Sequence, residues 1–233
     1  MNPKDYGNLI PAEAIQLQHE LRKKINLTPL TIEVKSIGGA DISFNKYSEV
    51  VYAGIIVLSY PDLKVIEQIT VVSSAAFPYI PGLLAFREIP ALLEVWEKLI
   101  KKPDILVLDG QGIAHERRMG IATHFGLLTD APSIGCAKSP LTGKWEQPAN
   151  TPFAESIIYS NNEEIGIALR SKKNCKPIYI SPGHKINLAQ SINLIKNCVR
   201  NYRIPEPTRL AHLLVNEARI ADSSSANNQM KLF

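Results

Sequence analysis

Cysteine pairs, long apolar segments and a secretory leader are all missing from this sequence of 233 residues. The three cysteines form no CxxC pair and no even framework, which argues against a structural zinc site and against a disulfide scaffold. The most apolar run, VVYAGIIVL, is too short to span a bilayer, and the charged amino terminus lacks an apolar signal core. We therefore expect a cytoplasmic protein without a membrane partner.

Acidic residues are absent from one long stretch of the chain. Eight lysine and arginine residues lie between Arg170 and Arg203 without a single Asp or Glu, while the whole chain carries a net charge of only +4. Such a stretch is suited to attract phosphates, as in a nucleic-acid-binding face. A solvated basic surface without a partner explains the same pattern equally well.

The patterning of apolar residues predicts one α/β domain. A hydrophobic content of 45% over this length is enough for one large core. We expect a monomeric domain over residues 1–220 and a flexible tail over 221–233, because ADSSSANNQMKLF is rich in small polar residues and has no period. The predicted elements are a helix from Pro11, three strands between Val34 and Ser73, a helix over 86–102, a strand over 105–109, a helix over 121–128, a strand over 132–139, a hairpin of 165–170 with 176–181, and helices from Asn187 and Thr208.

Two acids occupy positions where they are expected to meet. Asp109 ends the wholly apolar strand ILVL, and Asp41 lies on the first strand of the meander, on the face opposite Ala40 and Ile42. A right-handed crossover would place these two strands side by side and parallel. Adjacent strands lie roughly 4.8 Å apart, and two carboxylates on neighbouring strands repel each other unless a cation lies between them. Oxygen ligands favour Mg²⁺ or Mn²⁺. Taken singly, Asp41 could be an ordinary surface acid and Asp109 a helix cap.

Five stretches of the sequence together resemble one family, endonuclease V. They are FPYIPGLLAFRE (77–88), PDILVLDGQGIAHERRMGIATHFGLL (103–128), IGCAKSPLTG (134–143), SPGH (181–184) and EPTRLAH (206–212). The resemblance implies a ribonuclease H-like mixed sheet with flanking helices. It also implies a DNA repair nuclease that nicks at the second phosphodiester bond 3′ to deoxyinosine, leaving 3′-hydroxyl and 5′-phosphate ends.

The resemblance also assigns roles to individual residues. Its catalytic acids fall on Asp41, Glu88 and Asp109, which would hold Mg²⁺, with Mn²⁺ as a substitute. Lys138 would lie near the scissile phosphate, and His212 is assigned to the catalytic centre. Seen alone, Glu88 would be an ordinary acid in a first helical turn and Lys138 a surface lysine.

Recognition of the damaged base is expected to depend on the PYIP loop. The prolines would stiffen the loop so that Tyr79 enters the duplex as a wedge where the base is flipped out. By resemblance, the wedge comprises Pro78, Tyr79, Ile80 and Pro81, the base pocket Gly82, Leu84, Gly110 and Ile121, and the contacts to the DNA backbone His115, Arg117, Arg118 and His184.

The sequence departs from the family pattern at two positions. Bacterial members often have histidine where this chain has Gln111 and proline where it has Glu116, so we expect altered affinity rather than lost chemistry. The same acids would also serve an endonuclease that cleaves RNA at inosine. A non-catalytic module that only binds inosine is the remaining alternative, although the complete set of acids argues against it.

The carboxyl terminus carries a second motif. QMKLF, residues 229–233, resembles the short motif with which bacterial repair proteins bind the sliding clamp. Gln229 would then fix the orientation of the segment, while Leu232 and Phe233 would fill an apolar pocket. The alternative is a chance apolar end.

Overall fold

One mixed sheet organises the molecule in the computed structural model, which describes residues 2–45 and 48–230, with side chains as far as Asp222. The sheet has eight strands in the order β3-β2-β1-β4-β5-β8-β7-β6. The strands are β1 (Ser36–Phe44), β2 (Val50–Ser59), β3 (Val65–Ser74), β4 (Ile105–Leu108), β5 (Ser133–Ala137), β6 (Ala154–Ser160), β7 (Glu163–Arg170) and β8 (Ile178–His184). The predicted mixed α/β fold with flanking helices, in a single domain, is confirmed.

The centre of the sheet is parallel and its two sides are antiparallel. Strand β4 pairs in parallel with both β1 and β5, and its four residues are all buried. The predicted meander of β1, β2 and β3 is present, as is the predicted hairpin of β7 and β8. Because side chains of a central parallel strand are covered on both faces, only the strand's carboxyl end is left open for polar groups.

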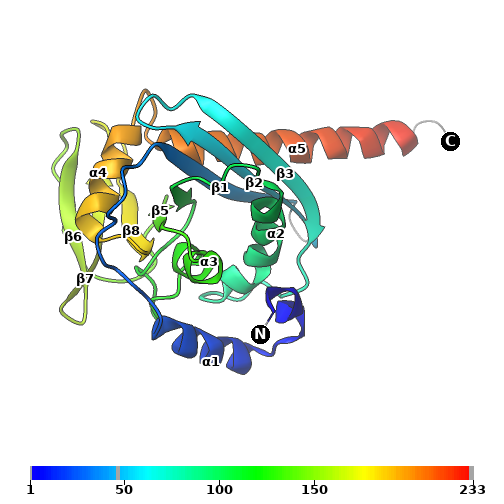
Figure 1. Cartoon of the computed structure of the whole chain (residues 1–233), viewed down its shortest axis with the longest axis horizontal. Helices are drawn as coiled ribbons and strands as arrows, with labels where there is room; N and C mark the ends of the chain where they lie inside the picture. The colour runs from blue at the N-terminus through cyan, green and yellow to red at the C-terminus, as the bar shows by residue number, and fades with distance from the viewer. Residues whose placement is uncertain (1, 46–47, 231–233) are drawn as a thin grey trace.

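Helices cover both faces of this sheet (Figure 1). They are η1 (Pro3–Asn8), α1 (Pro11–Arg22), α2 (Leu84–Lys98), α3 (Ile121–Thr129), α4 (Leu188–Cys198) and α5 (Glu206–Met230). Phe86 of α2 and Phe125 of α3 belong to the apolar core on one face of the sheet, together with Tyr6. Ile195 of α4 and Ala211 of α5 belong to the core on the other face.

The boundaries of some predicted elements were wrong. Helix α2 begins at Leu84 and ends at Lys98, so Glu88 lies in its second turn rather than its first. Strand β6 was not predicted, because it is an edge strand in which only Ile158 is buried, and its apolar residues do not alternate with polar ones. Strand β8 continues beyond the predicted end at residue 181 through the buried SPGH segment to His184.

The carboxyl-terminal helix is longer than the sequence indicated. Helix α5 runs to Met230, through most of the segment that was expected to be a flexible tail, and its end projects beyond the sheet (Figure 1). Alanine, serine and asparagine without a period give no apolar stripe, but they do not stop a helix that has already begun. The clamp-like motif therefore has Gln229 in this helix, while Leu232 and Phe233 lie outside the described residues.

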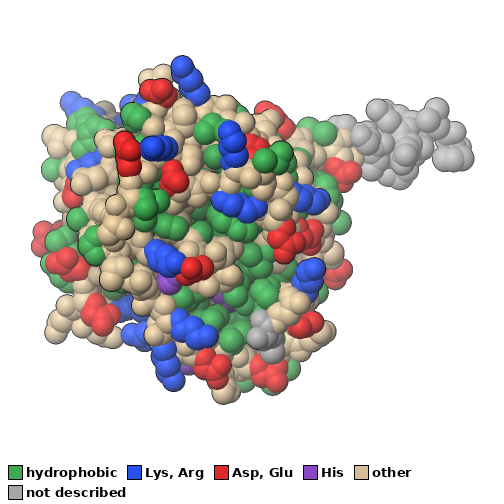
Figure 2. All heavy atoms as spheres, viewed as in Figure 1, with side chains coloured by type: hydrophobic (Ala, Val, Ile, Leu, Met, Phe, Trp, Pro, Cys, Tyr) green, Lys and Arg blue, Asp and Glu red, His purple; other side chains and the backbone are tan. Residues whose placement is uncertain are grey.

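The molecular surface mixes both signs of charge. On the face drawn in Figure 2, lysine and arginine side chains alternate with aspartate and glutamate. Within the part of the chain that the structure describes, no helix combines the length and the apolar character needed to cross a membrane.

Candidate active site

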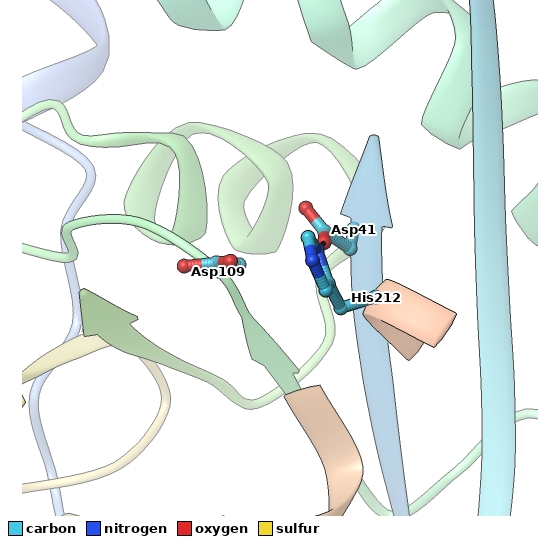
Figure 3. Close-up of side chains that lie close together, drawn as sticks. All are labelled: Asp41, Asp109 and His212. Atoms are coloured by element: carbon cyan, nitrogen blue, oxygen red, sulfur yellow. Dashed lines mark hydrogen bonds and ion pairs between the residues drawn. The ribbon is translucent and has the colours of Figure 1, made fainter. Parts of the chain in front are cut away.

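Asp41 and Asp109 lie at the same edge of the sheet because their strands are neighbours. Strands β1 and β4 pair in register up to Ala40 and Leu108, so the acids are the next residue on each strand. The backbone N–H of Asp109 also donates to the carbonyl of Ala40 at 3.1 Å. The predicted juxtaposition of the two carboxylates is therefore present at the carboxyl end of β4 (Figure 3).

His212 joins the two acids from a helix that packs against β1. It lies on α5, and its Nδ1 is 2.7 Å from Oδ2 of Asp41 (Figure 3). One potential ligand atom from each of Asp41, Asp109 and His212 lies within 4.8 Å of the others. The imidazole is half exposed, whereas the side chain of Asp41 is only 10% exposed. The histidine therefore forms the open rim of a cluster whose acids are largely shielded from solvent.

A chain of polar side chains holds the imidazole in place. Asn216, one turn further along α5, has its Nδ2 3.1 Å from Nε2 of His212. The Oδ1 of Asn216 accepts from the hydroxyl of Ser43 at 2.9 Å, and Arg219 donates to that hydroxyl at 3.0 Å. With Nε2 accepting from Asn216, the proton of the neutral ring is on Nδ1, directed at Asp41.

Glu88 lies close to the same two acids but outside the cluster of Asp41, Asp109 and His212. A small cavity of about 60 Å³ is lined by Asp41, Glu88 and Asp109 together with apolar side chains. Burial raises the pKa of the Glu88 carboxyl to about 8, and the charges of Asp41 and Asp109 act in the same direction. The structure thus brings all three sequence-predicted acids to one place.

This set of donors fits a hard divalent cation. Burial raises the pKa of Asp41 to about 6, and repulsion from Asp109 adds to the shift. A cation between the carboxylates would remove that repulsion, and carboxylate oxygens suit Mg²⁺ or Mn²⁺. Both nitrogens of His212 already have hydrogen-bond partners, so its geometry is that of a residue that orients Asp41 rather than of a metal ligand.

Lys138 brings a positive charge to the acids. It follows β5, the other neighbour of β4, and its ammonium group forms an ion pair with Oδ2 of Asp109. The side chain is 41% exposed, whereas that of Asp109 is 13% exposed. The lysine can therefore contact a phosphate from solvent while it remains beside the acids.

A cavity of about 380 Å³ opens next to the acids. It contains all four residues of the predicted base pocket: Gly82, Leu84, Gly110 and Ile121. Gly82 has φ +78°, which favours glycine, and a Cβ on Gly110 would lie 2.6 Å from the Cγ2 of Ile121. Both positions therefore need glycine for the cavity to keep its shape. Glu88, Asp109 and Lys138 also line this cavity, so the pocket and the acids share one opening.

The PYIP loop forms part of the cavity rim. Tyr79 and Pro81 line the cavity, and Tyr79 is 66% exposed. Pro78 is exposed as well, whereas Ile80 packs against the apolar core. An exposed aromatic ring at the mouth of a pocket is the arrangement that the wedge prediction requires.

The four residues expected at the DNA backbone have protein partners. His115 is buried with its Nε2 3.1 Å from the carbonyl of Gly82, and Arg117 donates to the same carbonyl at 2.9 Å. Arg118 is buried and pairs with Glu163 at 2.9 Å, and His184 is buried at the end of β8. The contacts of His115 and Arg117 with Gly82 stabilise the wall that Gly82 and His115 give to the pocket. A direct contact of these four side chains with DNA stays a prediction.

The two departures from the family pattern lie in different environments. Gln111 is buried, donates from Nε2 to the carbonyl of Ser139 at 2.9 Å, and lines the base pocket. Glu116 is exposed and lies 3.4 Å from the guanidinium of Arg117. The glutamate charge is thus partly offset by its neighbour, while the glutamine helps to hold the segment after β5.

Sequence reasoning missed part of this site. Ser139, Pro140 and Leu141 line the base pocket; they lie within the family stretch IGCAKSPLTG, but no role was assigned to them. Their position directly after β5, at the same sheet edge as Asp109, is the signal that could have identified them. Asn216 belonged to a polar stripe on the last helix that solvent exposure alone would also explain.

Comparisons with known proteins identify the family of this chain. The family model described as Endonuclease V matches residues 19–213. Endonuclease V of Dictyoglomus turgidum is 48% identical over 86% of this chain and 87% of its own length. The crystal structure of endonuclease V from Bacillus subtilis has a TM-score of 0.88 at 30% identity, covering 95% of this chain and 98% of that one.

A third relative was solved together with DNA. Endonuclease V of Ciona intestinalis, in complex with a 24mer DNA containing an inosine followed by a ribo-adenosine, has a TM-score of 0.79 at 31% identity. That alignment covers 90% of this chain and 98% of the Ciona chain. On the strength of the family model and of these matches over nearly its whole length, this chain belongs to the endonuclease V family.

Proposed function

We propose that this protein is a Mg²⁺-dependent endonuclease that nicks DNA at the second phosphodiester bond 3′ to deoxyinosine, leaving 3′-hydroxyl and 5′-phosphate ends. The observation that carries the proposal is the convergence of Asp41, Asp109 and His212 beside a cavity of about 380 Å³. The Ciona relative, which was crystallised with inosine-containing DNA, supports inosine as the lesion. The cavity would hold the flipped base while the acids lie at the phosphate.

Asp41 and Asp109 would hold the metal ion, with Glu88 as a third carboxylate lining the same small cavity. When bound, the ion supplies Lewis-acid activation and charge neutralisation at the phosphate. Lys138 would offset the negative charge that develops on the phosphate oxygens, since its ammonium group already lies beside Asp109. His212 would keep Asp41 in the orientation that binds the ion.

Base selection in this proposal comes from the cavity and its rim. Hypoxanthine pairs more weakly than a normal base, so flipping it out of the duplex costs less. Tyr79 would fill the vacated space in the stack, and backbone groups of Gly82 and Gly110 would approach the base closely because neither residue has a Cβ. The pocket would therefore select the lesion, and the acids would cut the strand that carries it.

The experiment is a nicking assay on a duplex with a single deoxyinosine. Wild-type protein should nick in Mg²⁺ and not in EDTA, whereas Asp109→Ala should lose nicking but still bind the inosine duplex, because the pocket and the basic surface remain. Nicking by Asp109→Ala at the wild-type rate would overturn the proposal. Binding without nicking by the wild type in Mg²⁺ would favour the non-catalytic module instead.

A second candidate function is cleavage of RNA at inosine. The observation that favours it is the ribo-adenosine that follows the inosine in the Ciona complex. The same acids would serve both substrates, because the cut bond is a phosphodiester in each. Paired assays on single inosines in DNA and in RNA of the same sequence decide between them, and faster cleavage of the RNA would make the protein an inosine-specific endoribonuclease.

A further inference from the structure

A second cavity, of about 670 Å³, adjoins the base pocket at the segment 138–140. Lys138, Ser139 and Pro140 line both cavities. The remaining lining residues of this second cavity are Gln147, Asn150, Arg170, Asn174, Cys175, Lys176, Pro177 and Tyr179. The ion pair of Lys138 with Asp109 places the catalytic acids at the boundary between the two cavities.

The charges around the second cavity are all positive. Among the described residues that line it, Lys138, Arg170 and Lys176 are basic and none is acidic. Arg170 donates to the backbone carbonyls of Ala149 at 2.8 Å and of Pro148 at 3.1 Å, so neutral groups rather than a carboxylate hold it. A guanidinium bound in this way keeps its net charge, and a concave surface concentrates the resulting field.

Arg203 adds a further positive charge behind the wall of the second cavity. Its guanidinium donates to the carbonyls of Lys138 at 2.8 Å, Lys176 at 2.8 Å and Pro177 at 2.7 Å. The two ends of the acid-free stretch, Arg170 and Arg203, therefore meet at one cavity. These bonds hold the lining segments in place. Of the basic residues in the stretch, Arg170, Lys176 and Arg203 lie at this cavity, whereas Lys185 pairs with Asp130 and Lys196 pairs with Glu155 elsewhere.

Amide side chains complete the wall. Asn150 donates from Nδ2 to Oδ1 of Asn174 at 2.8 Å, and the backbone N–H of Asn174 donates to Oδ1 of Asn150 at 2.8 Å. This reciprocal pair fixes two amide groups beside the cations. Fixed amides and cations without carboxylates are the groups that recognise phosphate oxygens.

We propose that the second cavity binds the phosphate backbone of the incised strand on the 3′ side of the cut. This inference rests on the proposed function, in which the flipped base occupies the first cavity and the cut lies 3′ to it. A strand that leaves the base pocket in the 3′ direction passes the acids at Asp109 and Lys138, and the second cavity begins at Lys138. The nucleotides beyond the cut therefore meet Lys176 and the amide pair.

The test measures binding to a labelled inosine duplex as a function of salt, with wild type, Lys176→Gln and Lys173→Gln. The control removes the same charge from the same segment, but Lys173 does not line the second cavity. Each cation bound to a phosphate contributes about 1 to the slope of log K against log salt. Lys176→Gln should lower that slope by about 1, and Lys173→Gln should leave it unchanged. Equal thermal unfolding midpoints show that both variants fold.

Two shortened duplexes decide which strand is bound. One lacks the incised strand beyond the cut, and the other lacks the complementary strand over the same span. The difference between Lys176→Gln and wild type should vanish only on the first. The inference would be overturned if Lys176→Gln and wild type differed on the first duplex but not on the second. It would also be overturned if Lys176→Gln and Lys173→Gln gave the same salt slope on the full duplex. Nicking of the full duplex by the wild type, measured in parallel, tests the proposed function separately.

Discussion

The Nδ1 of His212 lies 2.7 Å from Oδ2 of Asp41, across a contact between the last helix and the first strand. The proton on Nδ1 is directed at Oδ2, and the backbone N–H of Ile42 donates to Oδ1 at 2.8 Å, so both oxygens of Asp41 are held in the orientation in which the carboxylate would bind a metal ion. Asp41 is thus oriented by a residue that lies 171 positions away in the chain.

Replacing Asn216 should weaken metal binding without removing a ligand. In Asn216→Ala the imidazole loses its partner at Nε2 and can turn away from Asp41, so we expect a loss of about 10- to 100-fold in metal affinity. The measurement is the Mg²⁺ concentration that gives half-maximal nicking. Glu217→Gln, an exposed neighbour on α5, is the control and should keep the wild-type concentration. An unchanged Mg²⁺ requirement in Asn216→Ala would show that His212 needs no support.

Tyr79 should act on discrimination rather than on cleavage. Removing the exposed ring in Tyr79→Ala should reduce the preference for an inosine duplex over a normal duplex by about 1–3 kcal/mol, the range for one lost stacking contact. Competition binding of the two duplexes measures this preference. Tyr159→Ala removes another exposed tyrosine, on β6, away from the base pocket, and should have no effect. If both variants kept the full preference, Tyr79 would be a packing residue of the loop.

The stability of the fold should fall in acid because of a buried histidine. His124 is fully buried with its Nε2 2.8 Å from the hydroxyl of Tyr6, and burial lowers its pKa to about 3. An unfolded histidine has a pKa of about 6.5, so the unfolded state binds more protons between these two values. The contribution of neutral His124 to the free energy of unfolding is therefore complete above about pH 6.5. It is lost as the pH falls towards 3, by up to about 1.4 kcal/mol for each pH unit.

Chemical denaturation at pH 7 and at pH 5 measures this dependence. His124→Gln should reduce the difference in unfolding free energy between the two pH values, whereas His19→Gln, on the exposed side of α1, should leave it unchanged. His115 should contribute in the same direction, because burial and the neighbouring charge of Arg117 lower its pKa to about 4. A His124→Gln variant with the wild-type pH dependence would contradict the assignment.

Asp41 and Asp109 could be predicted from the sequence because their placement follows from local patterns, whereas the role of Glu88 followed only from the family resemblance. Period-two strands and a right-handed crossover are enough to align Asp41 with Asp109. The role of Asn216 could not be predicted in this way, because it depends on how α5 packs against β1. The second cavity could be predicted only in part. The acid-free stretch indicated phosphate binding, but Arg170 and Arg203, the two ends of that stretch, are brought together by the pairing of β7 with β8 and by the contacts of Arg203.

The same reasoning explains the errors at the edges of the fold. Strand β6 gave no period-two signal, because Ile157, Ile158 and Tyr159 are consecutive apolar residues and only Ile158 is buried at this edge of the sheet. The continuation of α5 past Ala221 was missed because serine and asparagine are weak helix formers, and a helix that is already nucleated can extend through them. In both places few side chains pack against the core, so the order of apolar and polar residues does not reveal the strand or the helix.

The last prediction concerns the segment that follows the domain. Helix α5 carries the chain away from the sheet (Figure 1), and the acids lie at strand ends of that sheet, so a partner bound at the end of the helix would leave the active site open. If QMKLF binds the sliding clamp, the full-length protein should bind purified bacterial clamp, and a labelled peptide of residues 221–233 should do so too. Replacing Leu232 and Phe233 together by alanine removes the apolar anchors and should abolish both interactions.

Gln229→Ala is the matched variant within the motif. It should weaken clamp binding without abolishing it, because it removes one polar contact and keeps both apolar anchors. Nicking of a short inosine duplex by the Leu232→Ala, Phe233→Ala variant serves as the control that the domain is folded, since these residues follow the catalytic domain. Absence of binding by the wild-type protein at high micromolar clamp would mean that the motif is a chance apolar end.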